Sequence, residues 1–142
     1  MRIIPVSLAL FYEFTNNVLK LWVQVRTDDG PYHGLLEFPG GGIENNESPM
    51  DAAKREVFEE VGISIDHLSG ELMGVYLNQF PGKTIQLYVH LFPVIPELEG
   101  RGQYLEIAAE KMSAPFQGLI PGPNHKIIDD LYLALQKRVH SW

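Results

Sequence analysis

The sequence has no cysteine among its 142 residues. Disulfide bonds and thiolate metal sites are therefore excluded, and any metal ion would have to be held by oxygen or nitrogen ligands. A chain without disulfides is compatible with a reducing compartment. We therefore expect a cytoplasmic protein.

Positive charge is also scarce, because 11 Lys and Arg residues stand against 18 Asp and Glu residues, and the net charge is −7. Binding to duplex DNA or RNA requires clustered basic side chains, so no duplex nucleic acid partner is expected. No run reaches the roughly 18 apolar residues of a membrane-spanning helix, so no membrane partner is expected either. An acidic protein can still bind a small polyphosphate if divalent cations neutralise both sides.

The segment 48–62 carries the marks of an amphipathic helix with defined ends. Ser48 is a good N-cap, Pro49 fits the first turn, Asp51 stands at the capping-box position, and Gly62 can provide the left-handed stop. Between these ends, apolar residues recur at steps of three and four. They are Met50, Ala53, Val57 and Val61.

Another side of the same helix is acidic. Glu56, Glu59 and Glu60 stand at helical offsets of zero, three and four, so their side chains should converge. Like charges at this spacing repel each other, and a divalent cation such as Mg²⁺ or Mn²⁺ suits such oxygen ligands. An ordinary solvated helix face, with Lys54 and Arg55 as local ion-pair partners, is the alternative.

The residues around this helix resemble the Nudix box, G-x5-E-x7-R-E-U-x-E-E-x-G-U, where U is a bulky aliphatic residue. Gly41, Glu47 and the run 55–63 match all nine fixed positions of the 23-residue pattern, and residues 36–41 are similar to the segment before the box in MutT-like members. The resemblance implies a Nudix hydrolase. It also implies the α/β (α+β) Nudix fold, an α/β/α sandwich with a mixed β-sheet, in a single domain over residues 1–142.

The resemblance assigns roles to the residues that match the box. Glu56, Glu59 and Glu60 would hold Mg²⁺ or Mn²⁺ together with the backbone carbonyl of Gly40. Arg55 would orient the glutamates and Glu47 would support the loop, although ordinary structural ion pairing would also explain those two. The general base would be Glu60 or a loop glutamate, for which the candidates are Glu106 and Glu110.

The implied reaction is metal-dependent hydrolysis of a nucleotide pyrophosphate bond, which releases a nucleoside monophosphate and pyrophosphate. Four residues match nucleotide-contacting positions of MutT-like proteins or could stack on a base, namely Arg26, Phe38, Phe80 and Asn124. Asn124 could read a purine edge, but it could equally cap the last helix. Likewise, Arg26 could be a solvated strand end and Phe38 a core residue.

The substrate stays open at this stage. The MutT-like segments indicate sanitation of oxidised purine nucleotides such as 8-oxo-dGTP, but Pro31 and Tyr32 depart from the histidine-containing loop of that group. Nucleoside-diphosphate sugars, dinucleoside polyphosphates and RNA 5′ ends are alternatives within the same chemistry. A non-catalytic nucleotide-binding sensor is the alternative of another class. The sequence is compatible with a monomer or a homodimer.

Elsewhere the pattern predicts two hairpins and a last helix. The first hairpin joins strands 3–14 and 18–26, a short strand covers 35–38, and the second hairpin joins 71–79 and 84–93 around Pro81 and Gly82. Residues 96–103 are predicted to form a polar loop. The last helix is expected from about residue 125 to residue 138, with Ile127, Ile128, Leu131, Leu135 and Val139 on its buried side.

Overall fold

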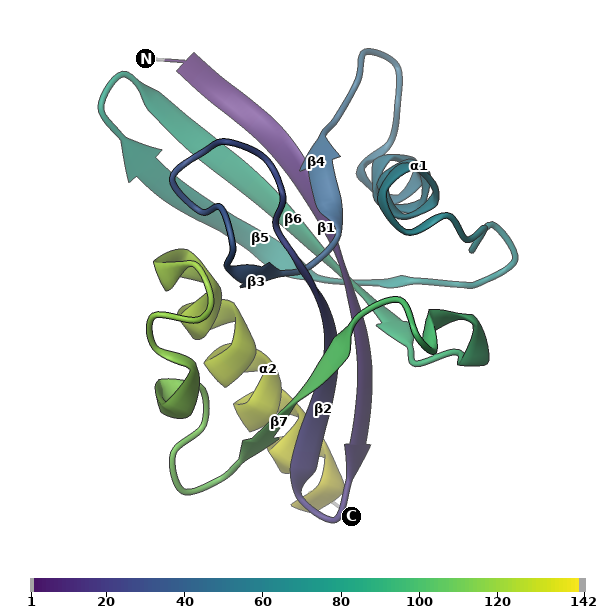
Figure 1. Ribbon diagram of the computed structural model, residues 1–142, viewed down its shortest axis with the longest axis vertical. Helices are drawn as coiled ribbons and strands as arrows, with labels where there is room; N and C mark the ends of the chain where they lie inside the picture. The colour runs from purple at the N-terminus through teal and green to yellow at the C-terminus, as the bar shows by residue number, and fades with distance from the viewer. Residues whose placement is uncertain (1, 141–142) are drawn as a thin grey trace. The chain divides into compact units, whose positions relative to one another are not determined.

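The computed structural model describes residues 2–140. The chain divides into two compact units. Figure 1 labels their helices and strands. The first unit contains the chain up to Phe11 and Phe38–Glu97, and the second contains Tyr12–Glu37 and the chain from Leu98 onward. Strand β1 (Arg2–Thr15) begins in the first unit and ends in the second.

The strands of the first unit are β1, β4 (Gly40–Gly42), β5 (Glu71–Phe80) and β6 (Lys83–Pro93). β4 pairs antiparallel with β1, β1 neighbours β6, and β6 pairs antiparallel with β5. The second predicted hairpin is therefore confirmed. No strand was predicted at β4, because glycine is rare in strands. Pairing with β1 is what makes these three glycines a strand.

Helix α1 (Pro49–Val61) forms where the sequence predicted it, and both caps are confirmed. The Ser48 hydroxyl accepts a hydrogen bond of 3.0 Å from the Asp51 N–H. At the other end Gly62 adopts φ = 83° and its N–H donates to the Phe58 carbonyl. The buried face consists of Ala52, Ala53, Val57 and Val61, whereas Met50 is only half-buried.

A buried polar link ties the start of α1 to the strands beneath it. The Ser7 hydroxyl on β1 donates to the Pro49 carbonyl at 2.6 Å, and His90 Nδ1 on β6 lies 3.1 Å from both the Ser7 hydroxyl and the Leu8 carbonyl. A carbonyl only accepts, so Nδ1 carries the proton. Burial lowers the pKa of His90, while the hydrogen bond to Leu8 opposes this shift, and the ring is favoured in its neutral form.

The second unit contains the end of β1 together with β2 (Val18–Val25), β3 (Leu36–Glu37) and β7 (Gln103–Ala108). β2 pairs antiparallel with β1, β3 and β7. Asn16 and Asn17 form the turn of the first predicted hairpin with φ of 54° and 61°, values that asparagine tolerates better than most residues. Short 3₁₀ turns follow β6 and β7, η1 (Pro96–Leu98) and η2 (Ala114–Phe116).

β7 begins where the predicted polar loop 96–103 ends, and it was missed by the sequence interpretation. Its residues alternate in burial, with Leu105 and Ile107 buried and Glu106 exposed. The prediction that Glu106 is a loop residue is therefore wrong, because backbone pairing with β2 places it on a strand. Glu110 lies in the turn that follows β7, as expected of a loop glutamate.

Helix α2 (Gly122–His140) is longer than predicted, since it begins before Asn124 rather than after it. Pro123 fits the first turn of a helix, where no N–H donor is required. The buried side contains Ile127, Ile128, Leu131, Tyr132 and Leu135, and the Tyr132 hydroxyl donates to the Asn17 carbonyl at 2.6 Å. Val139 is 51% exposed, so its assignment to the buried side is wrong.

Neither α1 nor α2, nor any other helix between residues 2 and 140, is long and apolar enough to cross a bilayer.

Candidate active site

The site in the first unit is formed where β4 passes beside α1. A Cβ atom at Gly41 would lie 2.5 Å from Glu56 Oε1, and one at Gly40 would meet the Ser7 carbonyl and the Leu8 side chain. Only glycine lets the backbone approach so closely. The strand can therefore lie directly against the helix that carries the three predicted metal ligands.

The edge of β4 that faces away from β1 is in contact with the acidic helix. The Gly40 N–H donates to Glu60 Oε2 at 2.8 Å, and the Gly42 carbonyl accepts from Arg55 Nη2 at 2.9 Å. In an antiparallel strand the N–H and C=O of one residue point to the same side. The Gly40 carbonyl, which was predicted as a metal ligand, is therefore on the side where Glu60 lies.

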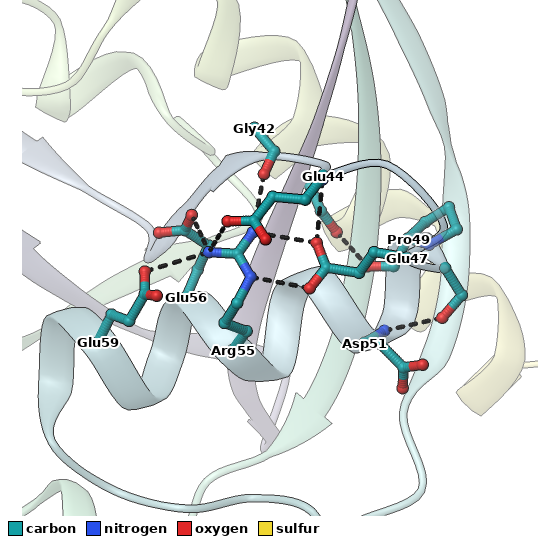
Figure 2. Close-up of polar contacts among 10 residues, drawn as sticks. Gly42, Glu44, Glu47, Pro49, Asp51, Arg55, Glu56 and Glu59 are labelled. Carbon is teal, nitrogen blue, oxygen red and sulfur yellow. Dashed lines mark hydrogen bonds and ion pairs between the residues drawn. The ribbon is translucent and has the colours of Figure 1, made fainter.

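Arg55 is the centre of the acidic cluster (Figure 2). Its Nε and Nη2 hold both oxygens of Glu47 at 2.8 Å and 3.0 Å, in a bidentate pair. Its Nη1 lies 2.9 Å from Glu56 Oε1 and 3.1 Å from Glu59 Oε2. Glu56 and Glu59 are therefore close neighbours, because both approach the same nitrogen.

Glu47 and Arg55 are both strongly favoured in their ionised forms. Hydrogen bonds from Arg55 lower the pKa of Glu47, and the N–H of Glu44 at 3.0 Å adds to this effect. In turn, the hydrogen bond to Glu47, followed by that to Glu56, raises the pKa of Arg55 above its ordinary value. The ion pair thus acts as a fixed support beside Glu56 and Glu59.

Between residues 2 and 140, no three acidic or histidine side chains are gathered closely enough to hold a metal ion as they stand. The carboxylates are instead directed at protein donors, with Glu56 and Glu59 at Arg55 and Glu60 at Gly40. The chemistry of the donor set nevertheless fits a hard divalent cation. It consists of carboxylate oxygens from one side of one helix, adjacent to a backbone carbonyl of β4.

Two predicted substrate residues belong to the same unit. Phe38 precedes β4 and is 3% exposed, which agrees with the alternative that it is a core residue. Phe80 ends β5, is 36% exposed, and has the Lys83 ammonium 5.7 Å from its ring centroid. Of these two aromatic rings, only that of Phe80 has substantial area open to a ligand.

The other predicted residues lie in the second unit. Arg26 is held by Asp28 at 2.8 Å and 3.1 Å and by Glu37 at 3.3 Å, with its guanidinium 5.8 Å from the Tyr32 ring centroid. Burial raises the pKa of Glu37, and the charge of Arg26 opposes this shift. Arg26 is therefore a partnered side chain in a small polar cluster rather than a plain solvated strand end.

Asn124 lies in the first turn of α2, and its N–H donates to the Pro121 carbonyl at 3.0 Å. The alternative that Asn124 is the N-cap is wrong, because the helix has already begun at Gly122. Glu106 on β7 and Glu110 in the following turn are both exposed.

The sequence interpretation missed two contributors to the cluster, the Gly42 carbonyl and Glu44. Glu44 is 68% exposed and lies 3.6 Å from Arg55 Nη1. Its position between Gly41 and Glu47 is a variable one in the box, so the motif gave no signal for it. The Gly42 carbonyl is a backbone atom, and no side-chain pattern could have indicated it.

Comparison with known proteins identifies the family. The model of the NUDIX domain family matches residues 5–112, so this chain belongs to the Nudix family of hydrolases. An RNA pyrophosphohydrolase of Bartonella bacilliformis is 41% identical over 51 residues, which make up 36% of this chain and 30% of that protein. An 8-oxo-dGTP diphosphatase of Escherichia coli is 39% identical over 72 residues, 51% of this chain and 54% of that protein. The matches thus span about a third to a half of the length of these relatives.

A MutT protein of Methanosarcina mazei has a similar structure, with a TM-score of 0.67, 17% sequence identity and 96% of each chain covered. At this identity the likeness shows the fold. The predicted fold class is thereby confirmed as the α+β Nudix fold with a mixed sheet and two helices. The predicted family, and the class of enzyme that it contains, are confirmed as well.

Proposed function

We propose that this chain hydrolyses the pyrophosphate bond of a nucleotide with the help of a divalent cation. The observation that carries the proposal is the acidic face of α1, where Glu56 and Glu59 approach the same nitrogen of Arg55 and Glu60 accepts a hydrogen bond from the Gly40 N–H of β4. Like-charged carboxylates so close together are expected where a cation is bound. A single arginine that supports two of them is consistent with a site that must keep its ligands oriented.

Glu56, Glu59, Glu60 and the Gly40 carbonyl would hold Mg²⁺ or Mn²⁺. When bound, such an ion neutralises phosphoryl oxygens and lowers the pKa of a water molecule. Arg55 positions Glu56 and Glu59 by hydrogen bonds, and Glu47 holds Arg55 in place. The negative charge of these carboxylates would repel the phosphates of a nucleotide unless a cation lay between them.

In the proposed reaction the oxygen of a water molecule forms a bond to phosphorus, and the bridging P–O bond breaks. A triphosphate then gives a nucleoside monophosphate and pyrophosphate, and the proton of the water passes to a carboxylate. Glu60, Glu106 and Glu110 are the candidates for that base. Glu60 belongs to the cluster through its bond to the Gly40 N–H, which supports it over the other two.

For the substrate we propose a purine nucleotide, with an oxidised guanine nucleotide such as 8-oxo-dGTP as the first choice. The Escherichia coli 8-oxo-dGTP diphosphatase supports this choice, whereas the RNA pyrophosphohydrolase of Bartonella bacilliformis supports an RNA 5′ end as the second. Phe80 would contact the base, whereas the burial of Phe38 argues against a direct contact. The contacts of Asn124 with the base edge and of Arg26 with the nucleotide are proposed from the resemblance alone. A cytoplasmic location, and the absence of duplex nucleic acid and membrane partners, are proposed from the acidic, cysteine-free composition.

The proposal is tested with a panel of nucleotides and capped or triphosphorylated RNA in the presence of Mg²⁺, scored for release of pyrophosphate against phosphate. Pyrophosphate release by the wild-type protein and its loss in Glu59→Gln support the enzyme. Tight nucleotide binding with no turnover of any substrate would support the sensor instead. A preference for 8-oxo-dGTP over dGTP that Asn124→Ala removes would support the choice of substrate, and equal rates would refute that choice while leaving the hydrolase intact.

A further inference from the structure

The edge strand β5 has an apolar surface that the proposed hydrolysis does not use. In the first unit β5 is the terminal strand, since it pairs with β6 on one side and with no other strand within residues 2–140. Leu72, Val75 and Leu77 are 51%, 45% and 63% exposed. These are high values for aliphatic side chains on a strand, and they need an explanation.

The three side chains lie on one face of the hairpin. Their register partners on β6 are His90, Tyr88 and Gln86, which alternate along that strand. The register shift between Leu72 and Gly74 keeps Leu72 in phase with the other two. We refer to Leu72, Val75 and Leu77 as the β5 stripe.

The edge lacks the usual protection against pairing. Native edge strands carry charged residues, proline or bulges that prevent another strand from adding. Between residues 72 and 79, β5 contains no charged residue and no proline, and its one register shift is close to its beginning. The segment from Gly74 to Phe80 is therefore a regular strand with N–H and C=O groups along its outer edge.

The charges at the two ends of β5 favour a second copy of the same strand as the partner. Glu71 begins the strand, and Lys83 follows the turn at its other end, where its ammonium lies over the Phe80 ring. In an antiparallel pair the beginning of one strand lies beside the end of the other. Glu71 of each copy would then be near Lys83 of its partner, twice in one interface, whereas a parallel pair would put like charges together.

We propose that β5 pairs antiparallel with β5 of a second copy of this chain, and that this contact forms a two-fold homodimer. A two-fold axis at right angles to the sheet joins the two sheets edge to edge and brings both β5 stripes side by side on one face. The pairing satisfies the outer backbone groups of β5 and covers the exposed aliphatic side chains. Both copies use the same surface, so the contact closes and does not propagate.

The test is the mass in solution, measured by sedimentation velocity over a wide range of protein concentration. The wild-type chain is expected at twice 16.0 kDa, and Leu77→Lys is expected at 16.0 kDa, because the two lysines would lie diagonally across the axis on one face, where their like charges repel each other. Leu133→Lys is the matched control, since Leu133 is 51% exposed on α2 and outside the stripe. Circular dichroism establishes that each variant is folded.

A charge reversal tests the antiparallel direction. Glu71→Lys and Lys83→Glu should each weaken the dimer, and the double variant should restore it. A wild-type chain of 16.0 kDa at every concentration overturns the proposal, as does a dimer that Leu77→Lys leaves intact or that Leu133→Lys also dissociates. Failure of the double variant to restore association would overturn the antiparallel pairing.

Discussion

At the scale of single residues, Arg55 makes the largest number of contacts in the acidic cluster, with four carboxylates and the Gly42 carbonyl. A guanidinium has five N–H donors in a fixed plane, and a lysine ammonium cannot reproduce that geometry. The sequence predicted the involvement of Arg55 and Glu47 because both are fixed positions of the box. The way in which Arg55 divides its donors among Glu47, Glu56 and Glu59 depends on the fold and could not be predicted.

Arg55→Lys is expected to retain the charge and lose the bidentate bond to Glu47. Supporting residues around a metal site typically contribute about 10- to 100-fold in affinity or activity, so we expect a loss of that order in the rate at limiting Mg²⁺. The measurement is the Mg²⁺ dependence of pyrophosphate release. Arg101→Lys, at an exposed position, serves as the control, and an unchanged Mg²⁺ dependence in Arg55→Lys would show that Arg55 is only structural.

Gly41→Ala tests the close approach of β4 to α1. The added methyl group would lie 2.5 Å from Glu56 Oε1, so the carboxylate would have to move. We expect hydrolysis to fall by about 10- to 100-fold while the protein stays folded. Gly42→Ala is the matched control, because a Cβ there has no neighbour within 4 Å and should leave the rate near that of the wild type. Equal rates in the two variants would contradict the assigned position of Glu56.

At the scale of elements, α1 was predictable because its caps and its apolar stripe are local signals. β4 was not, because three glycines acquire strand geometry only by pairing with β1. β7 could have been predicted from the sequence, because the polar Glu106 stands between the apolar residues Leu105 and Ile107. Such alternation is typical of a strand with one buried face. The start of α2 was misplaced because Asn124 has the side chain of a cap, while Pro123 allowed the helix to begin earlier.

Removal of the N-cap should destabilise α1. Ser48→Ala removes the acceptor of the Asp51 N–H, and such a change lowers the free energy of unfolding by about 1 kcal/mol. Urea denaturation followed by circular dichroism measures the loss. Ser69→Ala, at an exposed position outside the helices, should have no comparable effect, and equal stability of Ser48→Ala and the wild type would contradict the capping role.

The buried link through His90 should make stability depend on pH. The pKa of His90 is lowered in the folded state, so below its ordinary value of 6.5 the unfolded chain binds more protons than the folded one. Stability should therefore be complete above about pH 6.5 and fall as the pH drops toward the folded-state pKa. Urea denaturation at a series of pH values between the ordinary pKa values of carboxylates and histidine measures this dependence. His90→Asn should flatten the slope of unfolding free energy against pH. A slope that persists unchanged in His90→Asn would assign it to other groups.

At the scale of the whole molecule, the chain has the Nudix fold, yet its contacts divide into two compact units joined by the continuous strand β1. The box lies in the first unit, whereas Arg26, Asn124, Glu106 and Glu110 belong to the second. Local sequence signals therefore specify the acidic cluster well. Arg26 and Asn124, which are proposed to contact the substrate, lie outside the box, and no local sequence signal of comparable strength marks them.

The single domain predicted over residues 1–142 should unfold in one cooperative transition. Trp22 is 1% exposed in the second unit and reports on it through fluorescence, which can be read without interference in a Trp142→Phe variant. Far-ultraviolet circular dichroism reports on both helices. Coincident transitions in urea are expected, and two separate transitions would show that the two units are independent domains.

Side chains from one stretch of α1 are proposed to bind a divalent cation beside β4. The most direct measurement is the anomalous scattering of Mn²⁺ in crystals of the protein. We expect a peak in contact with the carboxylates of Glu56, Glu59 and Glu60 and near the Gly40 carbonyl, with the ion displacing contacts to Arg55. A peak held by other residues, in a protein that still releases pyrophosphate, would contradict it.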